Sequence, residues 1–207
     1  MHLRGVILEG YSNAGKTSVL KAIKRYQALD ETAERSVVVL GEHYSQVLNN
    51  VHGQFISLTP EEHLKLLRDR VDMLKNLDSW AAHLGPASRS SRGLFFVLER
   101  FHLNHRAAFP DEKSAEISLI EQDLLAMGAR CVLLTISDEV VEERVKSRQP
   151  AEWACKSREE IERSCNQLIH SQLEYRFQAE RSIIPTLEIN TDAKDWDEYA
   201  RLIMAGS

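Results

Sequence analysis

The most regular feature of the chain is a series of short apolar runs that do not alternate with polar residues. The runs are Gly5–Glu9, Ser36–Leu40, Leu94–Leu98, Cys131–Ile136 and Ile183–Ile189. A strand that is buried on both faces has no polar face, so its sequence lacks the alternation of a half-exposed strand. The five runs therefore predict the strands of a parallel sheet that is covered on both sides.

Stretches with helical periodicity lie between these runs. The clearest begins at residues 59–62 (TPEE), where a capping threonine precedes a first-turn proline and two acids, and it is predicted to continue to about Leu84. The other predicted helices are Lys16–Leu29, Glu112–Met127, Asp138–Arg148, Ser157–Arg181 and Trp196–Met204, and Gly85–Gly93 is a predicted loop. Strands that alternate with helices in this way predict a three-layer α/β fold.

Polar residues gather where three of the predicted strands end. The residue pairs are Glu9-Gly10, Gly41-Glu42 and Glu99-Arg100. In sheets of this kind, ligands bind at the carboxyl ends of the parallel strands. We therefore expect these pairs to meet at one edge of the sheet and to form a site.

The segment Gly10–Thr17 (GYSNAGKT) has the spacing of a phosphate-binding loop and lies between a predicted strand and a predicted helix. Its glycines let backbone N–H groups turn toward a phosphate, and the helix adds the positive end of its dipole. Lys16 is expected to be an exposed ligand of the β- and γ-phosphates, and the Thr17 hydroxyl to be a ligand of Mg²⁺. The residues predicted to bind ATP are Gly10, Tyr11, Ser12, Asn13, Ala14, Gly15, Lys16, Thr17 and Ser18.

Other sequence features narrow the class of P-loop protein. A GTPase needs an Asn-Lys-x-Asp base reader, whereas the nearest segment, residues 190–192 (NTD), lacks the lysine. Motor and transporter ATPases usually carry a strand that ends in two acids, but the third strand here ends in Glu99-Arg100. A chain of 207 residues is the length of one domain, so we expect a single kinase domain over residues 1–207.

Composition limits the partners and the compartment. The formal net charge of −5 argues against binding to polymeric nucleic acid, which requires a basic surface. The three cysteines fit neither a disulfide framework nor a metal site. Because no apolar run is long enough for a secretory signal or a membrane span, we expect a cytoplasmic protein that does not bind membranes.

Residues 7–17 (ILEGYSNAGKT) resemble the P-loop of thymidylate kinases and deoxynucleoside kinases. Four further segments look like the same superfamily, and they are Glu42, residues 66–74 (LLRDRVDML), residues 98–101 (LERF) and residues 137–150 (SDEVVEERVKSRQP). The resemblance implies a three-layer P-loop kinase fold with a five-stranded parallel sheet and a small lid at about residues 148–158. Residues 185–196 also have the form of the strand and loop that pass the adenine in this superfamily.

Phosphoryl transfer requires cations around the γ-phosphate. Arg100, Arg144 and Arg148 are the candidates, because a planar guanidinium bonds phosphate oxygens in pairs. Arg144 and Arg148 are four residues apart and share one helical face. For Arg144, a solvated helix face paired with neighbouring acids is an equal alternative.

The resemblance also suggests which residues handle the acceptor. Deoxynucleoside kinases have a glutamate at the position of Glu42, and it accepts the proton of the attacking hydroxyl. Glu99 is then the expected orienter or magnesium ligand, although the two acids are interchangeable in these roles. Thymidylate kinases line the base pocket with the helix that residues 66–74 resemble, which places Arg70 against the acceptor base. The predicted acceptor-binding residues are thus Glu42, Arg70 and Arg100.

Two departures from the thymidylate kinase pattern bear on the acceptor. Ser12 stands where that family has an aspartate, and residues 41–43 (GEH) stand where it has Arg-Glu-Pro. Because the missing arginine would grip the acceptor's phosphate, the sequence favours an uncharged nucleoside modestly over a nucleoside monophosphate. The sequence thus predicts an ATP- and Mg²⁺-dependent kinase of a nucleoside, deoxynucleoside or nucleoside monophosphate.

Two alternatives to this function stay open. One is a kinase of another small hydroxylated metabolite, such as an antibiotic, and the other is a regulator that binds a nucleotide without turnover.

His102 and His105 are interpreted as cleft-edge or helix-surface residues, and Trp196 as a packing residue. The oligomeric state stays open, and the resemblance suggests a homodimer in which the helix at Leu64–Leu77 packs against its twin.

Overall fold

The computed structural model describes residues 3–31, 33–34, 36–52, 54–83, 93–110, 115–148 and 150–206. Its centre is a five-stranded parallel sheet in the order β2-β5-β1-β6-β7. The strands are β1 (Leu3–Glu9), β2 (Ser36–Leu40), β5 (Leu94–Glu99), β6 (Ala129–Thr135) and β7 (Thr186–Asn190). The five predicted strands and their parallel arrangement are confirmed. Burial on both faces is wrong for the edge strands β2 and β7, most of whose residues are exposed or half-buried because each has a neighbouring strand on one side only.

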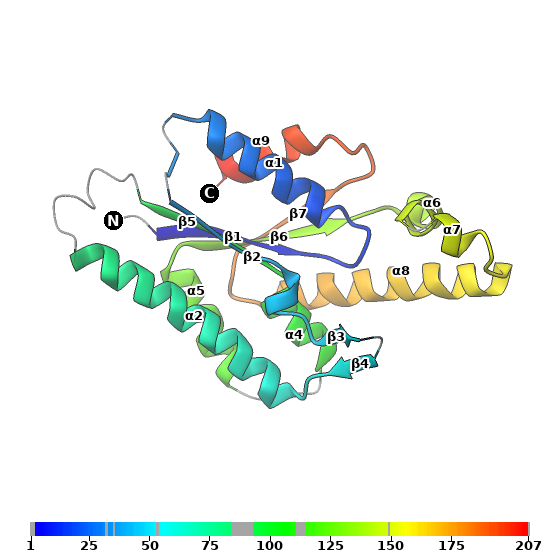
Figure 1. Ribbon diagram of the computed structural model, residues 1–207, viewed down its shortest axis with the longest axis horizontal. Helices are drawn as coiled ribbons and strands as arrows, with labels where there is room; N and C mark the ends of the chain where they lie inside the picture. Colours follow the sequence, from blue (N-terminus) through cyan, green and yellow to red (C-terminus); the bar gives the residue numbers. More distant parts are fainter. Residues whose placement is uncertain are drawn as a thin grey trace.

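Helices cover both faces of the sheet, as predicted (Figure 1). On one face lie α1 (Lys16–Leu29) and α9 (Trp196–Ala205). On the other lie α2 (Pro60–His83), α4 (His102–Ala108), α5 (Glu116–Ala126) and α8 (Arg158–Arg181). The pleat of β1 explains why both faces are apolar, since Val6 and Leu8 enter one core cluster and Ile7 enters the other.

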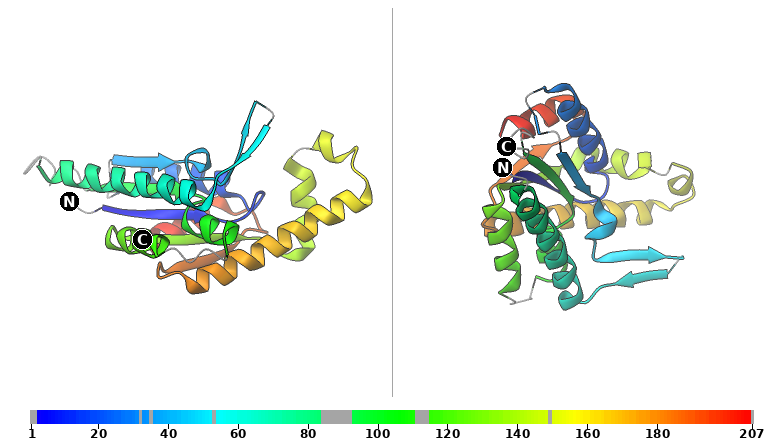
Figure 2. Two further views of the ribbon diagram at one scale, coloured as in Figure 1. Left: turned by 90° about the horizontal axis from the view of Figure 1, so that it is seen from below. Right: turned by 60° about the vertical axis from the view of Figure 1, so that its left-hand side comes forward.

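Two segments project from this body toward the carboxyl ends of the strands (Figure 2). One is a hairpin of β3 (Leu48–Val51) and β4 (Gln54–Ser57), which follows the short 3-10 helix η1 (Glu42–Tyr44). The other runs through α6 (Asp138–Arg148) and α7 (Pro150–Trp153) into the start of α8. The predicted lid segment, residues 148–158, includes α7.

The structure corrects several predicted elements. The hairpin was not predicted, because β4 is exposed along its whole length and therefore has no buried face to pattern the sequence. The last strand begins at Thr186 and not at Ile183, since the chain first turns through a hydrogen bond from the Ile184 N–H to the Ser182 hydroxyl. The start of the helix predicted from Glu112, and the loop predicted at Gly85–Gly93 apart from Gly93, lie outside the described residues.

The apolar face of α2 is used within the subunit. Leu64, Leu67, Val71 and Leu74 are buried in the core cluster that also contains residues of α5 and β5. The proposed pairing of two α2 helices in a homodimer would therefore have to use a different face. Within the described residues, no helix has the length and apolar content needed to cross a membrane.

Candidate active site

The loop between β1 and α1 has a backbone that few residues other than glycine adopt. Gly10, Asn13 and Gly15 have φ values of 130°, 75° and 91°. A Cβ atom at Gly10 would lie 2.5 Å from the carbonyl oxygen of Leu134, so this position must be glycine. At Gly15 a Cβ atom would lie 2.6 Å from the Trp196 ring. The two motif glycines thus let the loop pack closely on β6 and on the start of α9.

Lys16 is buried, which corrects the expectation of an exposed ligand. Its side chain is only 6% exposed, and its ammonium donates hydrogen bonds to the carbonyl oxygens of Gly10 (2.8 Å) and Tyr11 (3.1 Å). Burial, and next the Arg100 guanidinium, lower the pKa of Lys16 to about 7. The ammonium therefore lies inside the phosphate loop, where an added negative charge would stabilise its protonated form.

The amino end of α1 differs from those of α8 and α9. Among the described residues no side chain caps it, and its first turn has no acid. By contrast, Ser157 and Glu160 form a capping box at α8, and Asp195 caps α9. The positive end of the α1 dipole therefore faces the phosphate loop with no fixed counter-charge of its own, as an anion site requires.

A cavity of about 250 Å³ lies beside the phosphate loop. Its lining residues are Ser12, Asn13, Gly15, Lys16, Thr17, Ser18, Glu42, Arg100, Arg144, Ser147 and Trp196. Nine of these residues were predicted site residues, and they come from segments that are up to 132 positions apart in the sequence, Ser12 to Arg144. The carboxyl ends of β1, β2 and β5 thus meet at this cavity.

Glu42 and Arg100 form an ion pair at the cavity. The Arg100 Nε lies 2.9 Å from the Glu42 carboxylate, and its Nη2 donates a 2.8 Å hydrogen bond to the Ser12 hydroxyl. Arg100 has a φ of 51°, a left-handed conformation that is uncommon for arginine and turns the chain sharply after β5. Ser12 is therefore a hydrogen-bond partner of Arg100.

Glu99 lies behind this pair and is 7% exposed. Its carboxylate accepts a 3.3 Å hydrogen bond from the Glu42 backbone N–H, and its backbone carbonyl accepts one from the Ser45 hydroxyl. Burial raises the pKa of Glu99, and the neighbouring Glu42 carboxylate adds to the effect. Since Glu42 lines the cavity and Glu99 does not, the geometry suits Glu42 to contact an acceptor and Glu99 to orient Glu42.

Arg144 is buried and not on a solvated helix face. It is 6% exposed, donates a hydrogen bond to the Thr191 carbonyl, and places its guanidinium carbon 5.8 Å from the centroid of the Trp196 ring. Trp196, interpreted from sequence as a packing residue, packs on Gly15 and also lines the cavity. Arg148 is the last residue of α6, and its side chain lies outside what the structure describes.

Three further arginines, Arg68, Arg70 and Arg106, do not line the cavity beside the phosphate loop. Arg68 pairs with Asp123 and Glu116, and Arg106 forms a two-point pair with the fully buried Glu121. These two side chains are therefore engaged within the α2, α4 and α5 layer. Arg70 is half-buried on α2 and does not line the cavity beside the phosphate loop.

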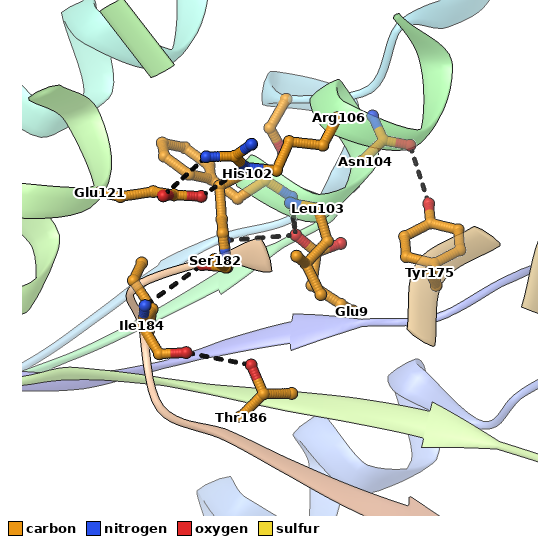
Figure 3. Close-up of polar contacts among 12 residues, drawn as sticks. Glu9, His102, Leu103, Asn104, Arg106, Glu121, Tyr175, Ser182, Ile184 and Thr186 are labelled. Atoms are coloured by element: carbon orange, nitrogen blue, oxygen red, sulfur yellow. Dashed lines mark hydrogen bonds and ion pairs between the residues drawn. The ribbon is translucent and has the colours of Figure 1, made fainter. Parts of the chain in front are cut away.

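Sequence reasoning missed the role of Glu9. Its Oε1 accepts hydrogen bonds from the N–H groups of Phe101 (2.9 Å) and Leu103 (3.0 Å), so the last residue of β1 caps α4 (Figure 3). The residue is fully buried, which raises its pKa to about 7. An acid at the end of an apolar strand, directly before the phosphate loop, was the signal in the sequence.

The histidines of α4 are core residues, which corrects their assignment to a cleft edge or helix surface. His102 is fully buried beside Glu9, and His105 is 1% exposed. Burial lowers the pKa of His102 to about 4. Within the described residues, no three His, Cys, Asp or Glu side chains are grouped closely enough to hold a metal ion.

The arrangement of sheet and helices is similar to that of P-loop kinases of known structure. The YorR protein of Bacillus subtilis, solved in complex with phosphorylated GDP, is 15% identical over 97% of this chain and 94% of its own, with a TM-score of 0.59. A gluconokinase from Sinorhizobium meliloti is 16% identical over 100% and 93%, with a TM-score of 0.54. A thymidylate kinase from Ehrlichia chaffeensis is 12% identical over 100% and 98%, with a TM-score of 0.51.

These likenesses establish the fold and not the substrate, because the identities are low. The sequence matches no family model and no curated protein sequence. The chain has the fold of P-loop kinases, with the phosphate loop, Glu42 and Arg100 at the edge where such sheets bind ligands.

Proposed function

We propose that this chain is an ATP- and Mg²⁺-dependent kinase that transfers the γ-phosphate to a nucleoside, deoxynucleoside or nucleoside monophosphate. The observation that carries the proposal is the shared cavity. Lys16, residues at the amino end of α1 and the Glu42–Arg100 pair all line it. A nucleotide-binding regulator has no need of an acid–arginine pair facing its phosphate loop.

The residues present fit a nucleoside triphosphate with magnesium. The loop has positive φ values at Gly10, Asn13 and Gly15, as phosphate-binding loops do, and it holds the Lys16 ammonium. The Thr17 hydroxyl, at the start of α1 and on the cavity wall, is the proposed protein ligand of the metal. When bound, ATP and Mg²⁺ supply the phosphoryl group and neutralise part of its charge.

The residues of the chain position the reactants and balance the charge. Lys16 contacts the donor phosphates, and Arg100, Arg144 and Arg148 meet the charge that develops on the transferring group. Glu42 accepts the proton of the attacking hydroxyl, while Glu99 holds the Glu42 backbone through the 3.3 Å hydrogen bond. Residues 148–158 act as the lid, which would exclude water during transfer.

The charge of the site supports an uncharged acceptor. Glu42 and Arg100 cancel each other, and Arg68 and Arg106 are paired with acids elsewhere. A monophosphate brings close to two negative charges, and burying these without paired cations is costly. We therefore favour a nucleoside over its 5′-monophosphate.

The adenine is proposed to lie near Trp196 and Arg144. Thr191 ties the loop after β7 to the phosphate loop, because its hydroxyl lies 3.0 Å from the carbonyl of Ala14 and 3.1 Å from that of Thr135 and shares its one proton between them. An indole next to a buried guanidinium offers a flat apolar surface and a cation to a purine ring.

A second candidate acceptor is a small hydroxylated metabolite that is not a nucleoside. The likeness to a gluconokinase favours it, since that fold relative is named for a sugar-acid acceptor. The same Glu42–Arg100 pair would serve its hydroxyl group.

The test is a panel of nucleosides, each measured against its own 5′-monophosphate, and of sugar acids, with ADP release as the signal. We expect kcat/KM to be higher for nucleosides than for the matched monophosphates. A preference for monophosphates would refute the uncharged acceptor, and turnover of sugar acids alone would select the second candidate. Binding of ATP without turnover of any acceptor would favour a regulator.

A further inference from the structure

Two buried histidines from different helices contact each other beneath the Glu42–Arg100 pair. His63 lies in the first turn of α2 and is fully buried, and His105 on α4 is 1% exposed. Their Nδ1 atoms are 2.9 Å apart. The start of α2 is fixed by reciprocal hydrogen bonds between Thr59 and Glu62, so the backbone that carries His63 is well anchored.

The rings face each other edge to edge. Their centroids are 5.1 Å apart and their planes differ by 21°. The centroid separation exceeds the separation of the two nitrogens by about two ring radii, so both Nδ1 atoms lie close to the line between the rings. This is the geometry of an in-plane N–H···N hydrogen bond and not of a face-to-face stack.

The partners assign the protons of both rings. The Nε2 of His63 lies 2.8 Å from the backbone carbonyl of Ser45, which only accepts, so Nε2 carries the proton. The Nδ1 of a neutral His63 must then accept, and the proton between the rings belongs to His105. Burial lowers the pKa of both rings, to about 3 for His105, so both are neutral near pH 7.

Ser45 connects His63 to the proposed catalytic acids through hydrogen bonds. Its hydroxyl donates to the Glu99 carbonyl, and its N–H donates a 3.1 Å hydrogen bond to the Glu42 carbonyl. The Glu42 N–H in turn donates to the Glu99 carboxylate. The 3-10 turn that bears Glu42 is thus tied to β5 through Ser45, and Ser45 is tied to α2 through His63.

We propose that His63, oriented by His105, is a positioning residue that holds Glu42 and Glu99 in place through the Ser45 carbonyl. The proposal rests on the proposed function, since it assumes that Glu42 and Glu99 act in phosphoryl transfer. Packing alone does not require a histidine at position 63, because an apolar side chain would fill the same space between α2 and α4. An apolar side chain would, however, leave the buried Ser45 carbonyl without the His63 donor.

The test compares three variants. His63→Leu keeps the volume but removes the donor, whereas His63→Gln retains an amide N–H that reaches the Ser45 carbonyl. Glu34→Gln is the matched control, since Glu34 is a buried acid that pairs with Arg4 on the amino half of the sheet, away from the cavity. We expect His63→Leu to lower kcat about 10- to 100-fold, the size of a misplaced catalytic group.

Two further results are expected if His63 positions the acids. The KM for ATP changes by no more than about twofold in His63→Leu, because the donor side is untouched. His63→Gln recovers most of kcat, and Glu34→Gln loses stability while keeping kcat. The inference is overturned if His63→Leu keeps kcat, or if His63→Gln is as slow as His63→Leu.

Amide hydrogen exchange separates this inference from the proposed function. In His63→Leu, the amides of Glu42 and Ser45 should exchange several-fold faster while amides within β5 do not, and His63→Gln should behave as wild type. Without that selective change, the inference fails whatever the activity. If the change is seen and the wild type phosphorylates no acceptor, the proposed function fails while the positioning contact stands.

Discussion

Replacing Lys16 with methionine should stabilise the free protein at pH 7 while it abolishes nucleotide binding. Methionine has a similar length and is apolar, so it can occupy the buried position without a charge. The wild-type ammonium is buried and lies near the Arg100 guanidinium, and these two effects lower its pKa from 10.5 to about 7. Holding the protonated lysine in the folded chain at pH 7 therefore costs about 4 kcal/mol relative to the unfolded chain.

The lost hydrogen bonds of Lys16 offset part of the stability that Lys16→Met gains by removing the buried charge. The variant gives up the hydrogen bonds to the carbonyls of Gly10 and Tyr11, which together contribute about 2 kcal/mol. We therefore expect Lys16→Met to be about 2 kcal/mol more stable than wild type at pH 7. Between pH 7 and 10.5 the unfolded chain binds more protons at Lys16 than the folded chain, so wild-type stability rises with pH. By pH 10 the remaining cost is about 1 kcal/mol, and the variant should be the less stable protein.

The assay is urea unfolding of both proteins at pH 7 and pH 10 without nucleotide. Groups remote from Lys16 titrate alike in the two proteins, so the difference in their stability reports Lys16 together with Glu9 and Glu99, whose pKa values Lys16 lowers. Lys21→Met, an exposed position on α1, is the control and should differ from wild type by less than about 0.5 kcal/mol at either pH. A second comparison adds ATP and Mg²⁺ at about 100 times Kd, which should stabilise wild type by about 2.7 kcal/mol and the variant not at all.

Two results would refute this reasoning. One is a Lys16→Met protein that is less stable than wild type already at pH 7, which would mean that burial of the ammonium carries no net cost. The other is a stability difference that stays constant between pH 7 and pH 10. Stabilisation of the variant by ATP equal to that of wild type would refute the assignment of the phosphate loop itself.

The remaining predictions concern catalysis. Glu42→Gln should lower kcat about 10²- to 10⁴-fold, as loss of a general base does, and a milder loss than that of Glu99→Gln would exchange the two roles. Trp196→Leu should raise the KM for ATP with little change in kcat. An unchanged KM would mean that Trp196 is a packing residue and does not contact ATP. Arg148→Ala should lower kcat more than it raises the KM for ATP, whereas the buried Arg144→Ala should also lose stability, which thermal unfolding would detect.

The elements that local patterns specify were predicted well. The apolar runs Ser36–Leu40 and Leu94–Leu98 fall within strands, and the residues TPEE begin a helix through the hydrogen bonds between Thr59 and Glu62. Burial on both faces, as in β5, and capping each leave a mark within a few adjacent residues, although the run of β2 is as apolar and its residues are exposed or half-buried. The β3–β4 hairpin left none, because Phe55 is 73% exposed and its strand has no buried side.

The sequence by itself determined the fold and the backbone of the loop between β1 and α1. The loop's glycine spacing, its lysine and the strand before it are all contiguous, and the backbone conformations at Gly10 and Gly15 follow from residues that lie side by side in the chain. The rule that parallel strands bind ligands at their carboxyl ends then brought Glu42 and Arg100 to the same edge.

Only the tertiary structure decided the environments of these side chains. The burial of Lys16 and Arg144, the pairing of Glu42 with Arg100, and the contact of His63 with His105 join residues from separate elements. Exposure, ion pairing and pKa depend on which groups surround a residue in space, and residues 42 positions apart carry no local pattern that reveals their contact. For that reason the sequence predicted nine of the residues that line the cavity, and packing decided how exposed each side chain is and which groups it pairs with.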